Sequence, residues 1–130
     1  MILIDSSVWI DFFGVTPGPA GRELRRLIAL AGPIALPGLV ITEILQGLTR
    51  DVARIERYLS MWDLLEPHGF RTYRSAADIS RLARAKGITL TTVDNLIAAI
   101  AIEHRAALFT LDKDFSRIAQ VTDLLLYRLP

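Results

Sequence analysis

The sequence predicts an α/β fold, a three-layer α/β/α sandwich in which helices cover both faces of a central, mostly parallel sheet. Two observations carry this prediction. Short apolar runs typical of buried strands alternate along the chain with segments of helical period. The 130 residues are 52% hydrophobic and 22% charged, a composition that excludes disorder and suffices for one buried core. We therefore expect a single domain over residues 1–130.

Four short runs are predicted as strands because they are rich in β-branched residues or leucine, which suits a sheet covered on both faces. The sequence places them at Ile2–Ile4, Pro33–Leu36, Ala107–Leu111 and Leu124–Tyr127. Helical segments separate these runs, and this order favours strand–helix–strand crossovers between parallel strands.

Helical periods fill the segments between the strands. A first helix follows Asp5 and carries Trp9, Phe12 and Phe13 at i, i+3 and i+4 spacing, so these aromatic side chains are predicted to lie in the core. Residues 15–21 contain prolines and glycines and are predicted as a loop. Further apolar stripes predict helices over residues 24–31, 40–48, 52–62 and 70–86, the first ended by Gly32-Pro33 and the last capped by Gly87.

Charge balance and residue usage exclude several classes of protein. Lys and Arg total 15 against 14 Asp and Glu, a net charge of +1, so contact with nucleic acid requires a local patch. The chain has no cysteine, which rules out disulfides and thiolate metal sites. The longest apolar run, Leu96–Ile102, is too short for a membrane span and predicts a helix buried on all sides. With no signal-peptide pattern at the start, we expect a cytoplasmic protein.

Acidic residues fall at the ends of several predicted elements. Asp5 directly follows the first strand, and Asp112 follows the strand predicted at 107–111. Asp94 opens the all-apolar helix, and Glu43 borders the apolar stripe of residues 40–48. Ligands of open α/β sheets bind outside the carboxyl ends of the strands, where Asp5 and Asp112 are predicted to lie.

Each of these acids also has a purely structural explanation. Asp5 and Asp112 are good helix N-caps, the segment from Thr91 to Asp94 resembles a capping box, and Glu43 fits the border of an amphipathic helix. Separate explanations do not account for four acids placed beside apolar elements.

Convergence of the four acids would require a cation. Two carboxylates about 4 Å apart repel by roughly 4 kcal/mol at an effective dielectric constant of about 20. Carboxylate oxygens select Mg²⁺ or Mn²⁺, and such ions activate water and stabilise the developing charge of a phosphodiester. The two histidines, His68 and His104, lack an evident Ser or Asp partner and are predicted to be structural, which leaves a metal-activated water as the best nucleophile.

Four motifs occur in order along the chain: Ile2-Leu3-Ile4-Asp5-Ser6-Ser7 followed by Trp9-Ile10, Thr42-Glu43-Ile44-Leu45-Gln46-Gly47, Asp94-Asn95-Leu96-Ile97-Ala98-Ala99 and Leu108-Phe109-Thr110-Leu111-Asp112-Lys113-Asp114-Phe115. Together they resemble the PIN domain family, most closely the VapC-type toxins of bacterial and archaeal toxin–antitoxin pairs. The resemblance covers essentially the whole chain.

This resemblance implies a role for each matching residue. It implies that Asp5, Glu43, Asp94 and Asp112 form a catalytic, metal-binding quartet, that Asp114 is a further metal-binding acid, and that Ser6 and Thr110 orient the cluster. It also implies an Mg²⁺- or Mn²⁺-dependent endoribonuclease that cleaves RNA, usually as a homodimer, and that a cognate antitoxin neutralises.

Two other interpretations stay open at this point. One is a noncatalytic α/β interaction module whose acids are caps, and the other is a PIN-like nuclease outside any toxin–antitoxin pair. The RNA-binding surface is also open. The side chains of Arg71, Arg74, Arg81 and Arg84 fall within about 140° of one helical face at roughly 100° per residue, so they are either RNA contacts or an ordinary solvated face.

Overall fold

A five-stranded parallel sheet forms the centre of the computed structural model, which describes residues 1–130. The strand order is β3-β2-β1-β4-β5, and the strands are β1 (Ile2–Ile4), β2 (Ile34–Pro37), β3 (Leu64–Leu65), β4 (Ala107–Phe109) and β5 (Leu125–Leu126). Strand β1 lies in the middle, where Leu3 pairs with Ala35 of β2 and with Leu108 of β4. The carboxyl ends of β1 and β4 are therefore neighbours.

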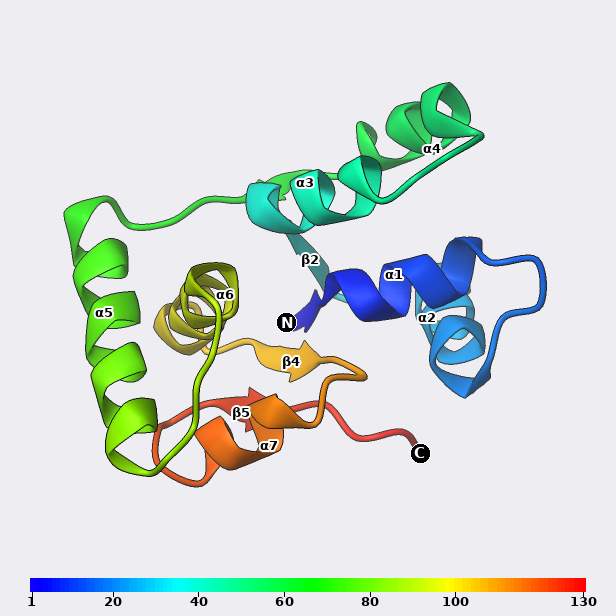
Figure 1. Cartoon of the computed structure of the whole chain (residues 1–130). Coiled ribbons are helices and arrows are strands. Elements are labelled where there is room, and N and C mark those ends of the chain that lie inside the picture. The colour runs from blue at the N-terminus through cyan, green and yellow to red at the C-terminus, as the bar shows by residue number, and fades with distance from the viewer.

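Seven helices surround the sheet, as Figure 1 shows. They are α1 (Ser6–Phe13), α2 (Pro19–Ala29), α3 (Gly38–Gln46), α4 (Val52–Leu59), α5 (Phe70–Ala85), α6 (Thr92–Glu103) and α7 (Asp114–Ala119). Helix α1 packs against α2 and α3, whereas α5 packs against α6. Figure 1 shows α1 and α2 to the right of the strands and α5 and α6 to the left. The predicted α/β architecture with a central parallel sheet is confirmed.

The hydrophobic core joins the sheet to both groups of helices. Leu3 and Ile4 of β1 are completely buried, as is Trp9 of α1. Trp9 stacks on Phe13 and meets the edge of Phe12, so the aromatic residues predicted for the core do pack together. Helix α6 is buried along most of its length, as its all-apolar sequence predicts. None of the helices combines the length and apolar character that crossing a bilayer requires.

Several predicted boundaries are wrong. Strand β2 ends one residue later than predicted, and β5 is two residues long instead of four. Strand β4 stops at Phe109, not Leu111, because the chain then turns and the Leu111 N–H donates to the Ser7 hydroxyl instead of to a neighbouring strand. Strand β3 and helix α7 were not predicted, since each is too short to display a period.

Helix α2 begins inside the segment predicted as a loop. Its first residue is Pro19, whose fixed φ suits the first helical position. The carboxylate of Asp11, on α1, accepts hydrogen bonds from the N–H groups of Gly18 and Gly21 at 2.9 and 2.7 Å. A Cβ on Gly21 would lie 2.9 Å from the backbone of Asp11, so α1 and α2 approach this closely only because residue 21 is glycine.

Candidate metal centre

Asp5 lies at the point where β1 ends and α1 begins, and only 5% of the residue is exposed. Its side chain does not cap α1. Instead, Oδ2 accepts hydrogen bonds from the hydroxyls of Thr110 at 2.7 Å and Ser7 at 2.9 Å. The backbone N–H of Asp5 donates to the carbonyl of Phe109 at the end of β4. The Asp5 carboxylate is therefore held at the carboxyl ends of the two central strands.

Asp112 is fixed by the same hydrogen-bond network. The Thr110 hydroxyl that donates to Asp5 also accepts a hydrogen bond from the N–H of Asp112 at 3.0 Å. One carboxylate oxygen of Asp112, Oδ1, accepts from the N–H of Asp114 at the start of α7. The N-cap residue of α7 is Lys113, so Asp112 is not the N-cap that its structural explanation predicts, and its backbone is linked to Asp5 through the Thr110 hydroxyl.

Glu43 extends from α3, and its Oε1 atom is buried without any hydrogen-bond partner. Burial raises the pKa of Glu43 above the ordinary carboxyl value. The nearby Ser6 side chain opposes this rise in pKa, whereas the negative charges of Asp5 and Asp94 add to it. An amphipathic helix border does not explain a buried, unpartnered carboxylate oxygen, because such an atom loses its hydration without compensation.

Asp94 occupies the first turn of α6, after the N-cap residue Thr91. The Thr91 hydroxyl accepts from the N–H of Asp94 at 3.1 Å, so the predicted capping interaction is present. Burial raises the pKa of Asp94, hydrogen bonding with Thr91 lowers it, and the charges of Asp112 and Asp5 raise it further. The carboxylate of Asp94 therefore faces the other acids while the backbone around it serves as the helix cap.

The structure brings all four predicted acids into one electrostatic environment. Each comes from a different part of the fold: the end of β1, the middle of α3, the start of α6 and the segment after β4. Their mutual charges disfavour full ionisation of Glu43 and Asp94. An all-carboxylate donor set with one orphaned buried oxygen fits a hard divalent cation.

The carboxylate oxygens of the four acids do not form a tight group. The only group of three or more His, Asp or Glu residues whose ligand atoms all lie within 4.8 Å of one another is His68, Glu103 and His104, at the far end of α6. The acids around Asp5 are therefore spaced more widely than direct ligation by three side chains requires. Mg²⁺ retains several water ligands in proteins, and a hydrated ion suits this wider spacing.

The residues predicted to support the acids occupy different positions. Thr110 contacts Asp5, and Ser6 contacts Glu43. Ser7 belongs to the first motif, but no role was predicted for it. Its hydroxyl donates a hydrogen bond to Asp5 and accepts one from the N–H of Leu111. Asp114 is exposed, and its N–H contacts Asp112. The run of two serines after Asp5 was the sequence signal for this second hydroxyl.

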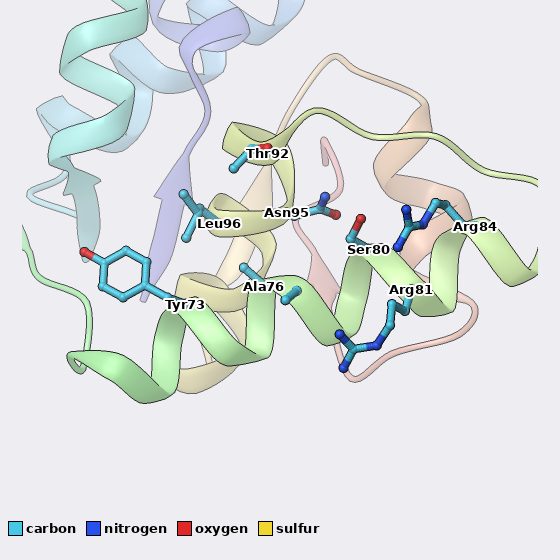
Figure 2. Close-up of a pocket in the computed structure, with 9 residues that line it drawn as sticks. Tyr73, Ala76, Ser80, Arg81, Arg84, Thr92, Asn95 and Leu96 are labelled. Carbon is cyan, nitrogen blue, oxygen red and sulfur yellow. The ribbon is translucent and has the colours of Figure 1, made fainter.

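Only two of the four arginines of α5 line a cavity. Arg81 and Arg84 line a cavity between α5 and α6, which Figure 2 shows in close-up. Arg71 instead approaches Nδ1 of His68 at 2.7 Å, and Arg74 is exposed outside the cavity. Four further residues of this cavity, which the sequence did not single out as RNA contacts, are Tyr73, Ser80, Thr92 and Asn95.

Comparisons with known proteins agree with this geometry. The family model of the PIN domain matches residues 2–121. VapC ribonuclease Mb1587 of Mycobacterium bovis and ribonuclease VapC11 of Mycobacterium tuberculosis are each 39% identical to this chain over 128 residues, which cover 95% of this chain and 96% of each relative.

Two solved structures show the same fold at lower sequence identity. VapBC2 from Rickettsia felis, bound to a promoter DNA fragment, has a TM-score of 0.77 at 21% identity and covers 98% of both chains. VapBC-1 from nontypeable Haemophilus influenzae has a TM-score of 0.75 at 19% identity and covers 99% of this chain and 98% of that chain.

Proposed function

The chain belongs to the PIN domain family, and on that premise we propose that it is a metal-dependent endoribonuclease, the toxin of a type II toxin–antitoxin pair. The observation that carries the proposal is the convergence of four carboxylates from four separate elements, with Oε1 of Glu43 buried and unpartnered among them. Relatives at 39% identity that are named ribonucleases support RNA as the substrate.

Asp5, Glu43, Asp94 and Asp112 would hold Mg²⁺ or Mn²⁺, with Asp114 as an additional acid at the exposed edge. When bound, the cation supplies charge compensation and activates water for attack on an RNA phosphodiester. The chain's own residues prepare the site. Thr110 and Ser7 fix one oxygen of Asp5, and Ser6 orients Glu43.

The proposal extends to partners and location. Relatives named VapC and solved VapBC complexes of the same fold support a cognate antitoxin protein as the partner. Several large apolar side chains are exposed, including Phe70 at 82% and Met61 at 73%, and we propose that some of them are covered in a homodimer or by the antitoxin. Residues 1–130 then form a single catalytic domain acting in the cytoplasm.

The direct test measures cleavage of RNA by the purified wild-type protein and its Asp94→Asn variant, with Mn²⁺ and with EDTA. The proposal expects cleavage only by the wild type and only with the metal. Retention of full cleavage by the variant would contradict the assignment of Asp94. If neither protein cleaves RNA and Mn²⁺ does not raise the melting temperature, the chain is a noncatalytic interaction module.

A second experiment tests the toxin role. The wild type and Asp94→Asn are induced in a bacterial host, with and without the product of the neighbouring gene, and the cleaved RNA ends are sequenced. Growth arrest by the wild type alone, relieved by the neighbouring protein, supports a toxin–antitoxin pair. Cleavage that the neighbouring protein does not suppress instead indicates a nuclease outside such a pair.

A further inference from the structure

A cavity of about 360 Å³ lies between α5 and α6, beside the acidic centre. Thr92 and Asn95 line it, and both lie in the first turns of α6, on either side of Asp94 in the sequence. The opposite wall comes from α5, through Tyr73, Ser80 and Arg84 among others. Figure 2 shows Tyr73 at one end of this wall and the two arginines at the other.

Asn95 is the most informative residue in the cavity. It is 4% exposed, and its Oδ1 atom is buried without a hydrogen-bond partner. Figure 2 shows its amide pointing across the cavity toward Ser80. A buried amide oxygen without a partner costs the fold stability, so its presence in the wall of this cavity points to a ligand that completes its hydrogen bonds.

The other lining groups define the chemistry of that ligand. The ring of Tyr73 is 56% exposed and offers a face for stacking. The guanidinium of Arg84 forms no ion pair or hydrogen bond with another side chain, and Arg81 pairs only with the exposed Asp78. An aromatic face, an amide and one free guanidinium match the bases and phosphates of a nucleic-acid strand.

We propose that this cavity binds consecutive nucleotides of single-stranded RNA adjacent to the cleaved bond, with Asn95 contacting a base edge, Tyr73 stacking on a neighbouring base and Arg84 neutralising a phosphate. The inference rests on the proposed ribonuclease function and adds a specificity subsite to it. Single-stranded RNA is favoured because only unpaired bases expose both a face and a hydrogen-bonding edge.

The first test measures binding without cleavage. Fluorescence anisotropy with a labelled 12-nucleotide single-stranded RNA in EDTA gives the dissociation constant of each variant. Tyr73→Ala is expected to weaken binding about 10-fold, whereas Tyr73→Phe, which keeps the aromatic face, is expected to stay within about two-fold of the wild type. Melting temperatures measured on the same samples exclude unfolding as the cause.

Arg84→Gln tests the phosphate contact, with Arg57→Gln as its matched control. Arg57 is an exposed arginine on α4, outside the cavity. Arg84→Gln is expected to weaken binding several-fold and to reduce the slope of log Kd against log salt by about 0.7, the value for one phosphate contact on a single strand. Arg57→Gln is expected to leave both quantities unchanged.

Asn95→Leu tests the base contact through cleavage of a randomised oligonucleotide pool in Mn²⁺. At one position beside the cleaved bond, the preference of the variant for one base over the others is expected to be about 10-fold weaker than that of the wild type. The base preferences at all other positions are expected to stay unchanged. An unchanged preference at every position, or unchanged RNA binding by Tyr73→Ala and Arg84→Gln, overturns the subsite while leaving the ribonuclease function standing.

Failure of the two proposals can be told apart. Suppose that neither the wild type nor any variant cleaves RNA, but Tyr73→Ala and Arg84→Gln still weaken RNA binding. The proposed ribonuclease function is then wrong, and the cavity remains an RNA-binding site. If these variants weaken the complex with the antitoxin and leave RNA binding unchanged, the cavity is a peptide site and the inference is wrong.

Discussion

Helix α6 has a carboxylate at each end, and the two ends differ in how their polar atoms are satisfied. Near the C-terminal end, Glu103 accepts hydrogen bonds from the Thr72 hydroxyl at 2.8 Å to both oxygens and from the N–H of His68. At the N-terminal end, Asp94 faces other negative charges, and the adjacent Asn95 has an unpartnered oxygen.

The difference separates a structural acid from a candidate functional one on the same helix. Glu103 joins the start of α5 to the end of α6, and its neighbours His68 and His104 pack their rings 4.4 Å apart. All of its partners come from within the fold. The end of α6 around Asp94 lacks such partners, and we propose that a cation and single-stranded RNA supply them. Unsatisfied polar atoms thus distinguish the two ends better than residue type does.

The largest expected difference between the two ends of α6 is in the rate of RNA cleavage. Asp94→Asn should lower RNA cleavage by at least about 100-fold, because loss of a ligand charge should cost no less than loss of an outer-shell partner. Glu103→Gln should stay within about two-fold of the wild type, since roughly 13 Å of helix separates the two residues. Initial rates on one RNA in Mn²⁺ measure both. Equal losses in the two variants would remove the distinction between the helix ends.

Metal binding should depend on the same end of the helix. A cation present at about 100 times its dissociation constant stabilises the native state by roughly 2.7 kcal/mol, which corresponds to several degrees in Tm. Thermal melts with Mn²⁺ should show this rise for the wild type and for Glu103→Gln. The rise should be lost in Asp94→Asn. A rise that disappears only in Glu103→Gln would move the metal site to the histidine end.

Substitutions at the two ends of α6 should change the free energy of unfolding of the metal-free protein in opposite directions. Glu103→Ala leaves the Thr72 hydroxyl, which is completely buried, without its acceptor and should cost about 1–3 kcal/mol. Asp94→Asn removes one of several like charges and should stabilise the metal-free protein by up to roughly 1 kcal/mol. Urea denaturation in EDTA measures both free energies of unfolding. A loss of stability in Asp94→Asn would mean that its charge is compensated within the fold.

The smallest expected effect is on the pH dependence of stability. Folding raises the pKa of Glu43 and Asp94, so the native state binds more protons than the unfolded chain between their ordinary and raised pKa values. Metal-free stability should therefore rise, by roughly 1 kcal/mol or less, as the pH falls from neutral into that window. The double variant Glu43→Gln, Asp94→Asn should show a flatter profile in urea melts at pH 5 to 7. Identical profiles would show that these two groups do not titrate abnormally.

The positions of the acids can be predicted from the sequence more readily than the side chains that surround them. Asp5 and Asp112 follow apolar strands, and topology alone places such residues at one edge of the sheet. The unpartnered state of Glu43 could not be read from the sequence, because it depends on which side chains reach it from α1 and α6. The unpartnered Oδ1 of Asn95, on which its proposed role rests, could not be predicted for the same reason, because it is a property of the packed structure.

The errors in the fold have a similar cause. Strand β3 contains only Leu64 and Leu65, and its assignment depends on pairing with Leu36 and Pro37 of β2. Helix α7 has six residues, too few for a recognisable period. Strand β3 is thus defined by a distant partner and α7 is too short, whereas a sequence pattern detects only local preference repeated over several residues.

The central position of β1 has a consequence for the order in which the site assembles. Its partner β4 begins more than a hundred residues later in the sequence, at Ala107. The hydrogen bond from the Thr110 hydroxyl to Asp5 joins residues that are 105 positions apart. A contact of this separation forms only after a long loop has closed, so we expect the acidic centre to assemble late in folding, after the local helices.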